Sequence, residues 1–146
     1  MPSVDPPPPV PLQPEEEIRG EWNVPWHRTG FESVTRLVLT NRRLVVHCVF
    51  TRAGWFAGRH ARATVDLGRW QELLDAPLER LADPSFEDQK VGIGVLTELI
   101  IHGRPILIID TDNQGFVESI LPRISQARSA RIAELPPERT AGTEPV

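Results

Sequence analysis

Apolar and polar residues alternate over much of the first half of the chain, which is the pattern of half-buried β-strands. In residues 17–24 this alternation places Ile18, Trp22 and Val24 near one face of a strand. Residues 64–67 show a shorter run of the same kind. The chain is therefore expected to be built mainly from strands.

Two hairpins stand out in this pattern. Residues 33–50 contain two runs rich in β-branched side chains around a short break at Asn41-Arg42. Because asparagine tolerates a positive φ, such a break predicts a tight turn between antiparallel strands. Residues 94–110 repeat the arrangement around residues 102–104, and the second strand there is apolar without interruption. That continuity predicts burial on both faces of the strand.

Two further segments have the spacing of helices. Apolar residues recur at helical intervals over residues 70–82, and Pro77 divides this segment into two short pieces. Residues 113–133 predict one longer helix with Asp112 as its N-cap, kinked at Pro122. The buried stripe of this helix is expected to consist of Phe116, Val117, Ile120, Leu121, Ile124 and Ala127.

Proline is concentrated at the two ends of the chain. Residues 1–15 are expected to form a disordered arm, because proline lacks an N–H and fixes φ. Docking of this arm in an aromatic groove is the alternative. Residues 134–146 are expected to be a disordered tail. The folded part is expected to be one domain over residues 16–133, of α+β class because strands precede a single helix.

Residues 39–44, with the sequence Leu-Thr-Asn-Arg-Arg-Leu, resemble the strand–turn–strand signature of bacterial pleckstrin-homology-like (PH-like) and GRAM-type domains. The order of several strands, a late hairpin and one C-terminal helix is also similar to these families. The resemblance covers about residues 16–132. It implies a bent antiparallel β-barrel of about seven strands, capped by the C-terminal amphipathic helix.

Charge changes this picture in one segment. The chain has a formal net charge of −4, yet residues 27–62 carry seven arginines against one glutamate. Some of these arginines lie at the tip of the first hairpin, and others flank two aromatic residues in the connection that follows. The candidate binding residues are therefore Arg42, Arg43, Arg52, Trp55, Phe56, Arg59 and Arg62.

Tryptophan and arginine dominate protein-binding hot spots, and they also suit an anionic membrane interface. We expect a non-enzymatic module that binds a protein partner or self-associates, and the alternative is an adaptor for anionic lipid headgroups. A third interpretation has the two rings folded back over the barrel mouth, with the arginines solvated. A small hydrolase or a ligand-binding barrel also stays open. A pI near 5.6 argues against a nucleic-acid partner.

The sequence predicts no cofactor and no metal. Cys48 is the only cysteine, and its neighbour His47 points to the opposite face of the predicted strand, so the two cannot form a dyad. Residues 110–115 begin like a calcium loop, but Leu121 stands where the loop needs a glutamate. Since there is no apolar run of about 18 residues and no signal sequence, a cytoplasmic location is expected.

Overall fold

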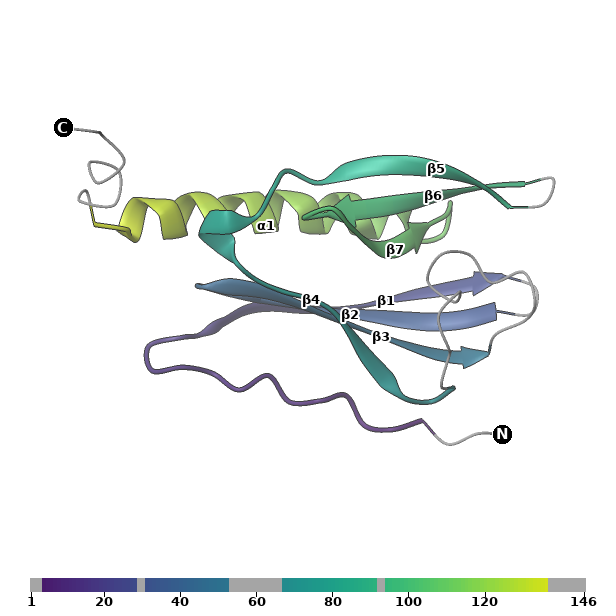
Figure 1. Cartoon of the computed structure of the whole chain (residues 1–146), viewed down its shortest axis with the longest axis horizontal. Helices are drawn as coiled ribbons and strands as arrows, with labels where there is room; N and C mark the ends of the chain where they lie inside the picture. The colour runs from purple at the N-terminus through teal and green to yellow at the C-terminus, as the bar shows by residue number, and fades with distance from the viewer. Residues whose placement is uncertain (1–3, 29–30, 53–66, 92–93, 137–146) are drawn as a thin grey trace.

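The computed structural model describes residues 4–28, 31–52, 67–91 and 94–136 (Figure 1). The first antiparallel sheet has the strand order β1 (Ile18–Arg28), β2 (Phe31–Thr40), β3 (Arg43–Arg52) and β4 (Trp70–Pro77). The second has the order β5 (Ser85–Val91), β6 (Gly94–Ile101) and β7 (Arg104–Ile109). One turn of 3-10 helix (Leu78–Arg80) joins the sheets, and helix α1 (Gln114–Glu134) ends the fold. The α+β class is therefore confirmed.

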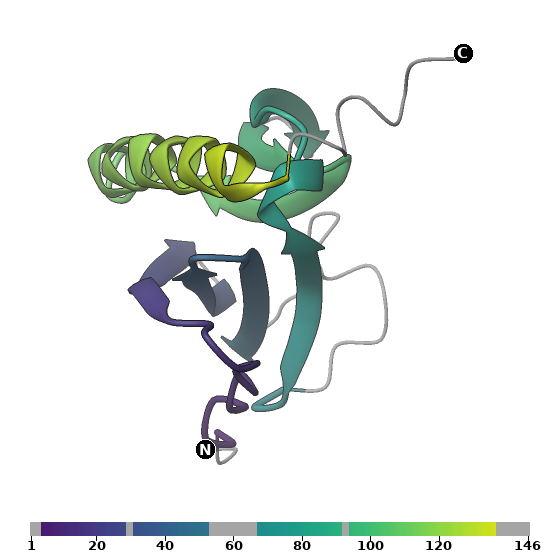
Figure 2. The same cartoon turned by 90° about the vertical axis from the view of Figure 1, so that its left-hand side faces the viewer.

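The layers are clearest in Figure 2, where α1 and the three-stranded sheet lie together on one side of the four-stranded sheet. The apolar core fills the space between them. Leu37, Leu44, Leu99, Ile106 and Ile120, which come from both sheets and α1, are at most 2% exposed. Within the described ranges the two sheets do not close into a barrel. The structure thus confirms the class of the fold and leaves the predicted barrel unconfirmed.

The first predicted hairpin is confirmed, although its turn works differently from the prediction. Leu39 lies opposite Leu44. The turn does not use a positive φ at Asn41; among the described non-glycine residues, Glu15 and His102 have one. Instead the Thr40 hydroxyl accepts hydrogen bonds from the backbone N–H groups of Arg42 and Arg43, at 3.0 and 2.9 Å. A short hydroxyl side chain stabilises the turn in this way.

The second predicted hairpin is also confirmed. His102 and Gly103 form a two-residue loop with φ values of 57° and 73°, the conformation that matches the twist of antiparallel strands. Three consecutive residues of β7, Ile106, Leu107 and Ile108, are buried. Burial on both faces of this strand is therefore confirmed, and it explains the uninterrupted apolar run.

Strand β1 confirms the predicted strand over residues 17–24 and extends it. Val24 is buried, whereas Ile18, which the alternation placed near the same face, is 47% exposed. The pairing with β2 shifts register between Ile18 and Gly20, which breaks the alternation there. Pro25 lies within the strand without cost to the ladder, because β1 is at the edge of its sheet.

The helix predicted over residues 70–82 is wrong. Trp70–Pro77 is strand β4, paired with β3, and only Leu78–Arg80 is helical, as a single 3-10 turn. Leu74 and Ala76 are buried with a period of two, which pairing with β3 imposes. Strand β5 is missing from the prediction because its sequence is mostly polar. In both cases pairing with a neighbouring strand overrides the local pattern.

Helix α1 confirms the predicted C-terminal helix and continues through Pro122. Its N-cap is Asn113 rather than the predicted Asp112, because the Asp110 carboxylate accepts the N–H groups of both residues. Phe116 is 43% exposed, so its predicted burial is wrong. The buried stripe consists of Val117, Ile120 and Ile124, with Leu121 and Ala127 partly buried.

The proline-rich arm, expected to be disordered, lies extended beneath the four-stranded sheet in Figure 1 before the chain turns into β1. Hydrogen bonds to the sheet hold it, as described below. The strand predicted over residues 64–67 falls almost entirely outside the described residues, as does most of the predicted tail. The division into arm, domain and tail stays a prediction.

Glycine-to-alanine substitutions at two positions are expected to have opposite effects on stability. Gly103→Ala lowers the free energy of unfolding by about 1 kcal/mol, because φ at this position is +73° and a Cβ is strained there. Gly115→Ala, in the first turn of α1 with open space around its Cβ, raises it by about 0.5 to 1 kcal/mol. Urea unfolding of both variants measures the two changes. If the free energy of unfolding changes in the same direction in both variants, the turn geometry is contradicted.

Candidate binding site

Most of the predicted arginine-rich loop lies outside the described residues. Trp55, Phe56, Arg59 and Arg62 fall in residues 53–66, so their binding role stays a prediction. The remaining residue of that loop, Arg52, ends β3 and is exposed.

The other two predicted binding residues lie at the tip of the first hairpin, where they contact this chain. Arg43 forms ion pairs with Glu16 at 2.9 Å and Asp75 at 3.0 Å, and it also donates to the carbonyl of Pro11. Arg42 approaches Glu15 at 3.5 Å. The structure therefore brings both arginines together with carboxylates of the chain itself. Their use by an outside partner stays a prediction.

Glu16 is the centre of this cluster. Its side chain is 1% exposed, and it accepts hydrogen bonds from the Thr40 hydroxyl at 2.7 Å and the Gln13 N–H at 3.0 Å, in addition to Arg43. Burial alone raises the pKa of the Glu16 carboxyl, but the hydrogen bonds from Arg43, Gln13 and Thr40 outweigh it and lower the pKa overall. The carboxylate is therefore charged and fully partnered at neutral pH.

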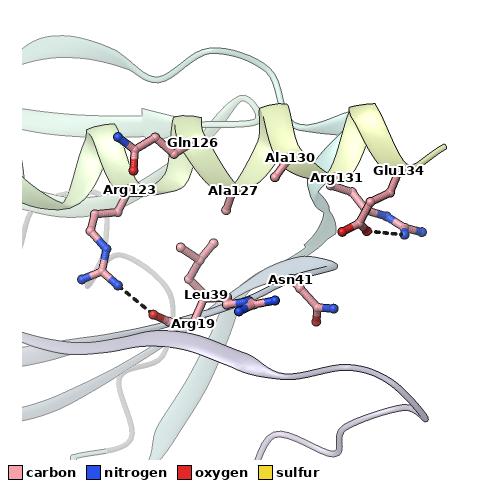
Figure 3. A pocket seen from close by; sticks show the side chains of 9 residues that line it. All are labelled: Arg19, Leu39, Asn41, Arg123, Gln126, Ala127, Ala130, Arg131 and Glu134. Carbon is pink, nitrogen blue, oxygen red and sulfur yellow. Dashed lines mark hydrogen bonds and ion pairs between the residues drawn. The ribbon is translucent and has the colours of Figure 1, made fainter.

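A separate cleft, which we call the arginine cleft, lies between the paired strands β1 and β2 and the C-terminal half of α1 (Figure 3). Its volume is about 440 Å³. Three arginines and two side-chain amides line it, together with one carboxylate and three small or aliphatic side chains. The lining residues are Arg19, Leu39, Asn41, Arg123, Gln126, Ala127, Ala130, Arg131 and Glu134.

Arg123 is the best-positioned cation of this cleft. It donates to the carbonyl of Arg19 at 2.7 Å, and its guanidinium carbon lies 5.1 Å from the centroid of the Trp22 ring. Gly20 leaves room for that ring, because a Cβ at this position overlaps it. Among the described residues no carboxylate pairs with Arg123. A carbonyl and a ring face thus hold the Arg123 guanidinium in place, and no carboxylate in the described ranges neutralises its charge.

The other two arginines of the cleft are partly neutralised. Arg131 lies 3.6 Å from both Glu79 and Glu134, and Arg19 lies 3.4 Å from Glu17. The Arg19–Glu17 pair is exposed, and such pairs are weak, whereas Arg131 and Glu79 are only 20% and 17% exposed. Of the three guanidiniums, Arg123 has no carboxylate partner among the described residues, Arg19 is in an exposed pair, and Arg131 is held by Glu79 and Glu134.

Sequence reasoning missed this cleft because its cations are far apart in the chain. Arg19 and Arg123 come from β1 and α1, and only the fold brings them together. A partial signal exists on α1, where Arg123 and Arg131 flank two alanines on one helical face. Small residues between cations leave a hollow beside a sheet, which is how the cleft arises.

The thiol of Cys48 and the imidazole of His47 lie outside the cleft. Of the described residues that line the cleft, none is a serine, cysteine or histidine. Cys48 is buried, accepts a hydrogen bond from Thr35, and has a pKa raised by burial to about 11, so it is a poor nucleophile. Burial lowers the pKa of His47, which lies on a different face from the cleft. No group of three potential metal ligands occurs in the part of the chain that the structure describes.

Comparison of the chain with protein-family models, with curated proteins and with solved structures finds no match. The resemblance to PH-like domains therefore rests on the hairpin motif and the order of elements. In the described ranges, no helix combines the length and apolar character that crossing a membrane requires.

Replacing Glu16 is expected to give a pH-dependent loss of stability. Glu16→Gln lowers the free energy of unfolding by about 2 kcal/mol at pH 7, because it removes a buried carboxylate that Arg43 and Thr40 bind. Since folding lowers the pKa of Glu16, its contribution is present above about pH 4.5 and is lost as the pH falls through the lower folded value. Urea unfolding between pH 7 and pH 3 measures the difference.

The control is Glu17→Gln, which removes an exposed carboxylate one residue away. Its effect is expected to stay below about 0.5 kcal/mol at every pH. A Glu16→Gln effect that stays constant as the pH falls contradicts the assignment of a charged, hydrogen-bonded Glu16.

Proposed function

We propose that this chain is a non-enzymatic interaction module of PH-like fold, and that it binds an acidic segment of a partner protein in the cleft beside α1. Support for the PH-like fold comes from the Leu-Thr-Asn-Arg-Arg-Leu hairpin of residues 39–44, from a four-stranded sheet followed by a three-stranded sheet, and from one C-terminal helix. The observation that carries the binding proposal is Arg123, an oriented cation in a cleft that holds three arginines and one glutamate.

The geometry of Arg123 suits a carboxylate. A guanidinium is planar and presents paired N–H groups, which match the two oxygens of a carboxylate. Because Trp22 and the Arg19 carbonyl already restrict this side chain, little conformational freedom is lost when a ligand binds. The amides of Asn41 and Gln126 line the same cleft and can pair with the backbone of the ligand.

The shape of the cleft favours a peptide over a membrane surface. Its walls are α1 and the β1–β2 hairpin, and Arg123 lies between them as Figure 3 shows. A chain segment can enter such a hollow, whereas a bilayer contacts protruding groups most easily. A carboxylate-bearing peptide is therefore the preferred ligand, and anionic headgroups serve as the comparison in the test.

Substitution of Arg123 is expected to weaken binding of an acidic peptide at least about tenfold, a loss of about 1.4 kcal/mol. The probe is a fluorescein-labelled ten-residue peptide of Glu, Asp and Ser, measured by fluorescence anisotropy against the full chain and against Arg123→Gln. Added salt is expected to weaken binding to the wild-type chain, because the attraction is electrostatic.

The matched control is Arg128→Gln, on the same helix but paired with Asp83 and outside the cleft lining. It is expected to change the dissociation constant less than about twofold. Equal losses in both variants, or tight binding to phosphatidylserine vesicles that Arg123→Gln leaves unchanged, contradict the proposal. A larger species that forms with rising concentration in light scattering indicates self-association instead.

A further inference from the structure

The proline-rich arm makes a regular set of contacts with the face of the four-stranded sheet that points away from the core. The indole N–H of Trp70 donates to the carbonyl of Asp5 at 2.8 Å, and Arg36 donates to the carbonyl of Pro8 at 2.7 Å. Arg43 donates to the carbonyl of Pro11. The three acceptors are spaced three residues apart along the arm.

This spacing is that of a polyproline II helix, which has three residues per turn and no internal hydrogen bonds. Residues three apart therefore present their carbonyls on the same side, one per turn. Prolines occupy five of the seven positions from Asp5 to Pro11, and their fixed φ favours this conformation. Each turn of the arm thus offers one carbonyl to one donor of the sheet.

The donors come from three different strands and are oriented by the sheet itself. Arg36 on β2 is held by Glu21 on β1 through a hydrogen bond of 2.7 Å. Arg43 on β3 is held by Asp75 on β4 at 3.0 Å. Because Glu21 and Asp75 both belong to the sheet, the two guanidiniums keep these partners whether or not the arm is in place.

Between the donors lies an apolar floor. Val38 and Val45 are opposite each other on β2 and β3 and are 0% and 2% exposed. Their neighbours Leu37, Leu39 and Leu44 face the core on the other side of the sheet, since successive side chains of a strand alternate. An outward-facing valine pair that is fully buried needs a cover, and the arm lies along this face.

We propose that this outer face, which we call the polyproline groove (Trp70, Arg36, Arg43, Val38 and Val45), binds proline-rich segments of partner proteins and that the chain's own arm occupies it as an intramolecular competitor. The three hydrogen bonds from the groove to the arm all go to main-chain carbonyls. Any segment with one accessible carbonyl every third residue satisfies the same donors. The site is separate from the arginine cleft and does not depend on the function proposed for it.

The test uses the full chain and a labelled peptide with the sequence of residues 4–14. The wild-type chain is expected to bind this peptide weakly, because the peptide must displace the arm. Replacing Pro6, Pro7, Pro8 and Pro9 with glycine in the full chain makes the free arm more flexible and loosens it. This loosened-arm variant is expected to bind the peptide at least tenfold more tightly than the wild type, measured by fluorescence anisotropy.

Two comparisons identify the groove as the binding surface. In the loosened-arm variant, Trp70→Phe removes the indole donor and is expected to weaken peptide binding at least fivefold. Trp22→Phe makes the same change on the other side of the sheet and is expected to leave it within twofold. A peptide in which every proline is replaced with alanine is expected to bind at least tenfold more weakly than the original.

A folded loosened-arm variant that binds the peptide no more tightly than the wild type overturns the proposal. Dimers of the wild-type chain without peptide binding also overturn it, since the groove then serves the arm of a second copy. If circular dichroism shows that the variant is unfolded, the wild-type chain decides the question. Excess unlabelled peptide is then expected to shift the backbone N–H signals of Asp5 and Val10 in the chain's own arm, which it displaces, in a two-dimensional NMR spectrum of the isotope-labelled chain, and unchanged signals overturn the proposal.

Discussion

The buried ion pair between Arg43 and Glu16 determines how the chain enters and closes its first sheet. A carboxylate that is 1% exposed is stable only when donors surround it, and here they come from the start of β3, from Thr40 at the end of β2 and from the turn that precedes β1. Asp75 extends the same cluster to β4. One charged cluster therefore joins the arm, the central hairpin and the last strand of the sheet.

The four-stranded sheet separates two surfaces of different chemistry. Its inner face packs against the second sheet and α1 to form the core. The arginine cleft lies at the edge of this packed interface, between the sheet and α1. Its outer face holds the arm through hydrogen bonds to backbone carbonyls. A ligand in the cleft and a ligand on the outer face do not compete for the same side chains. The sheet thus carries two separate candidate sites, one on each face.

The sequence predicted the fold class and both hairpins because these depend on local patterns. The Asn41-Arg42 break marked the first turn, although the contacts that stabilise it come from Thr40. Strand β4 was mispredicted because its residues face inward only through pairing with β3, which no local period encodes. The loop around Trp55 and Phe56 stays a prediction. The arginine cleft was missed because Arg19 and Arg123 meet only in the folded chain, and the arm because its partners on the sheet come from distant strands.

The close packing of Gly20 against Trp22 links a residue without a side chain to the position of the Arg123 guanidinium. Any larger residue at position 20 displaces the indole ring, and Arg123 loses the aromatic face on which it rests. Position 20 does not line the cleft, yet it governs the direction in which the guanidinium points. A substitution at position 20 is therefore expected to change the chemistry of the cleft without changing any residue that lines it.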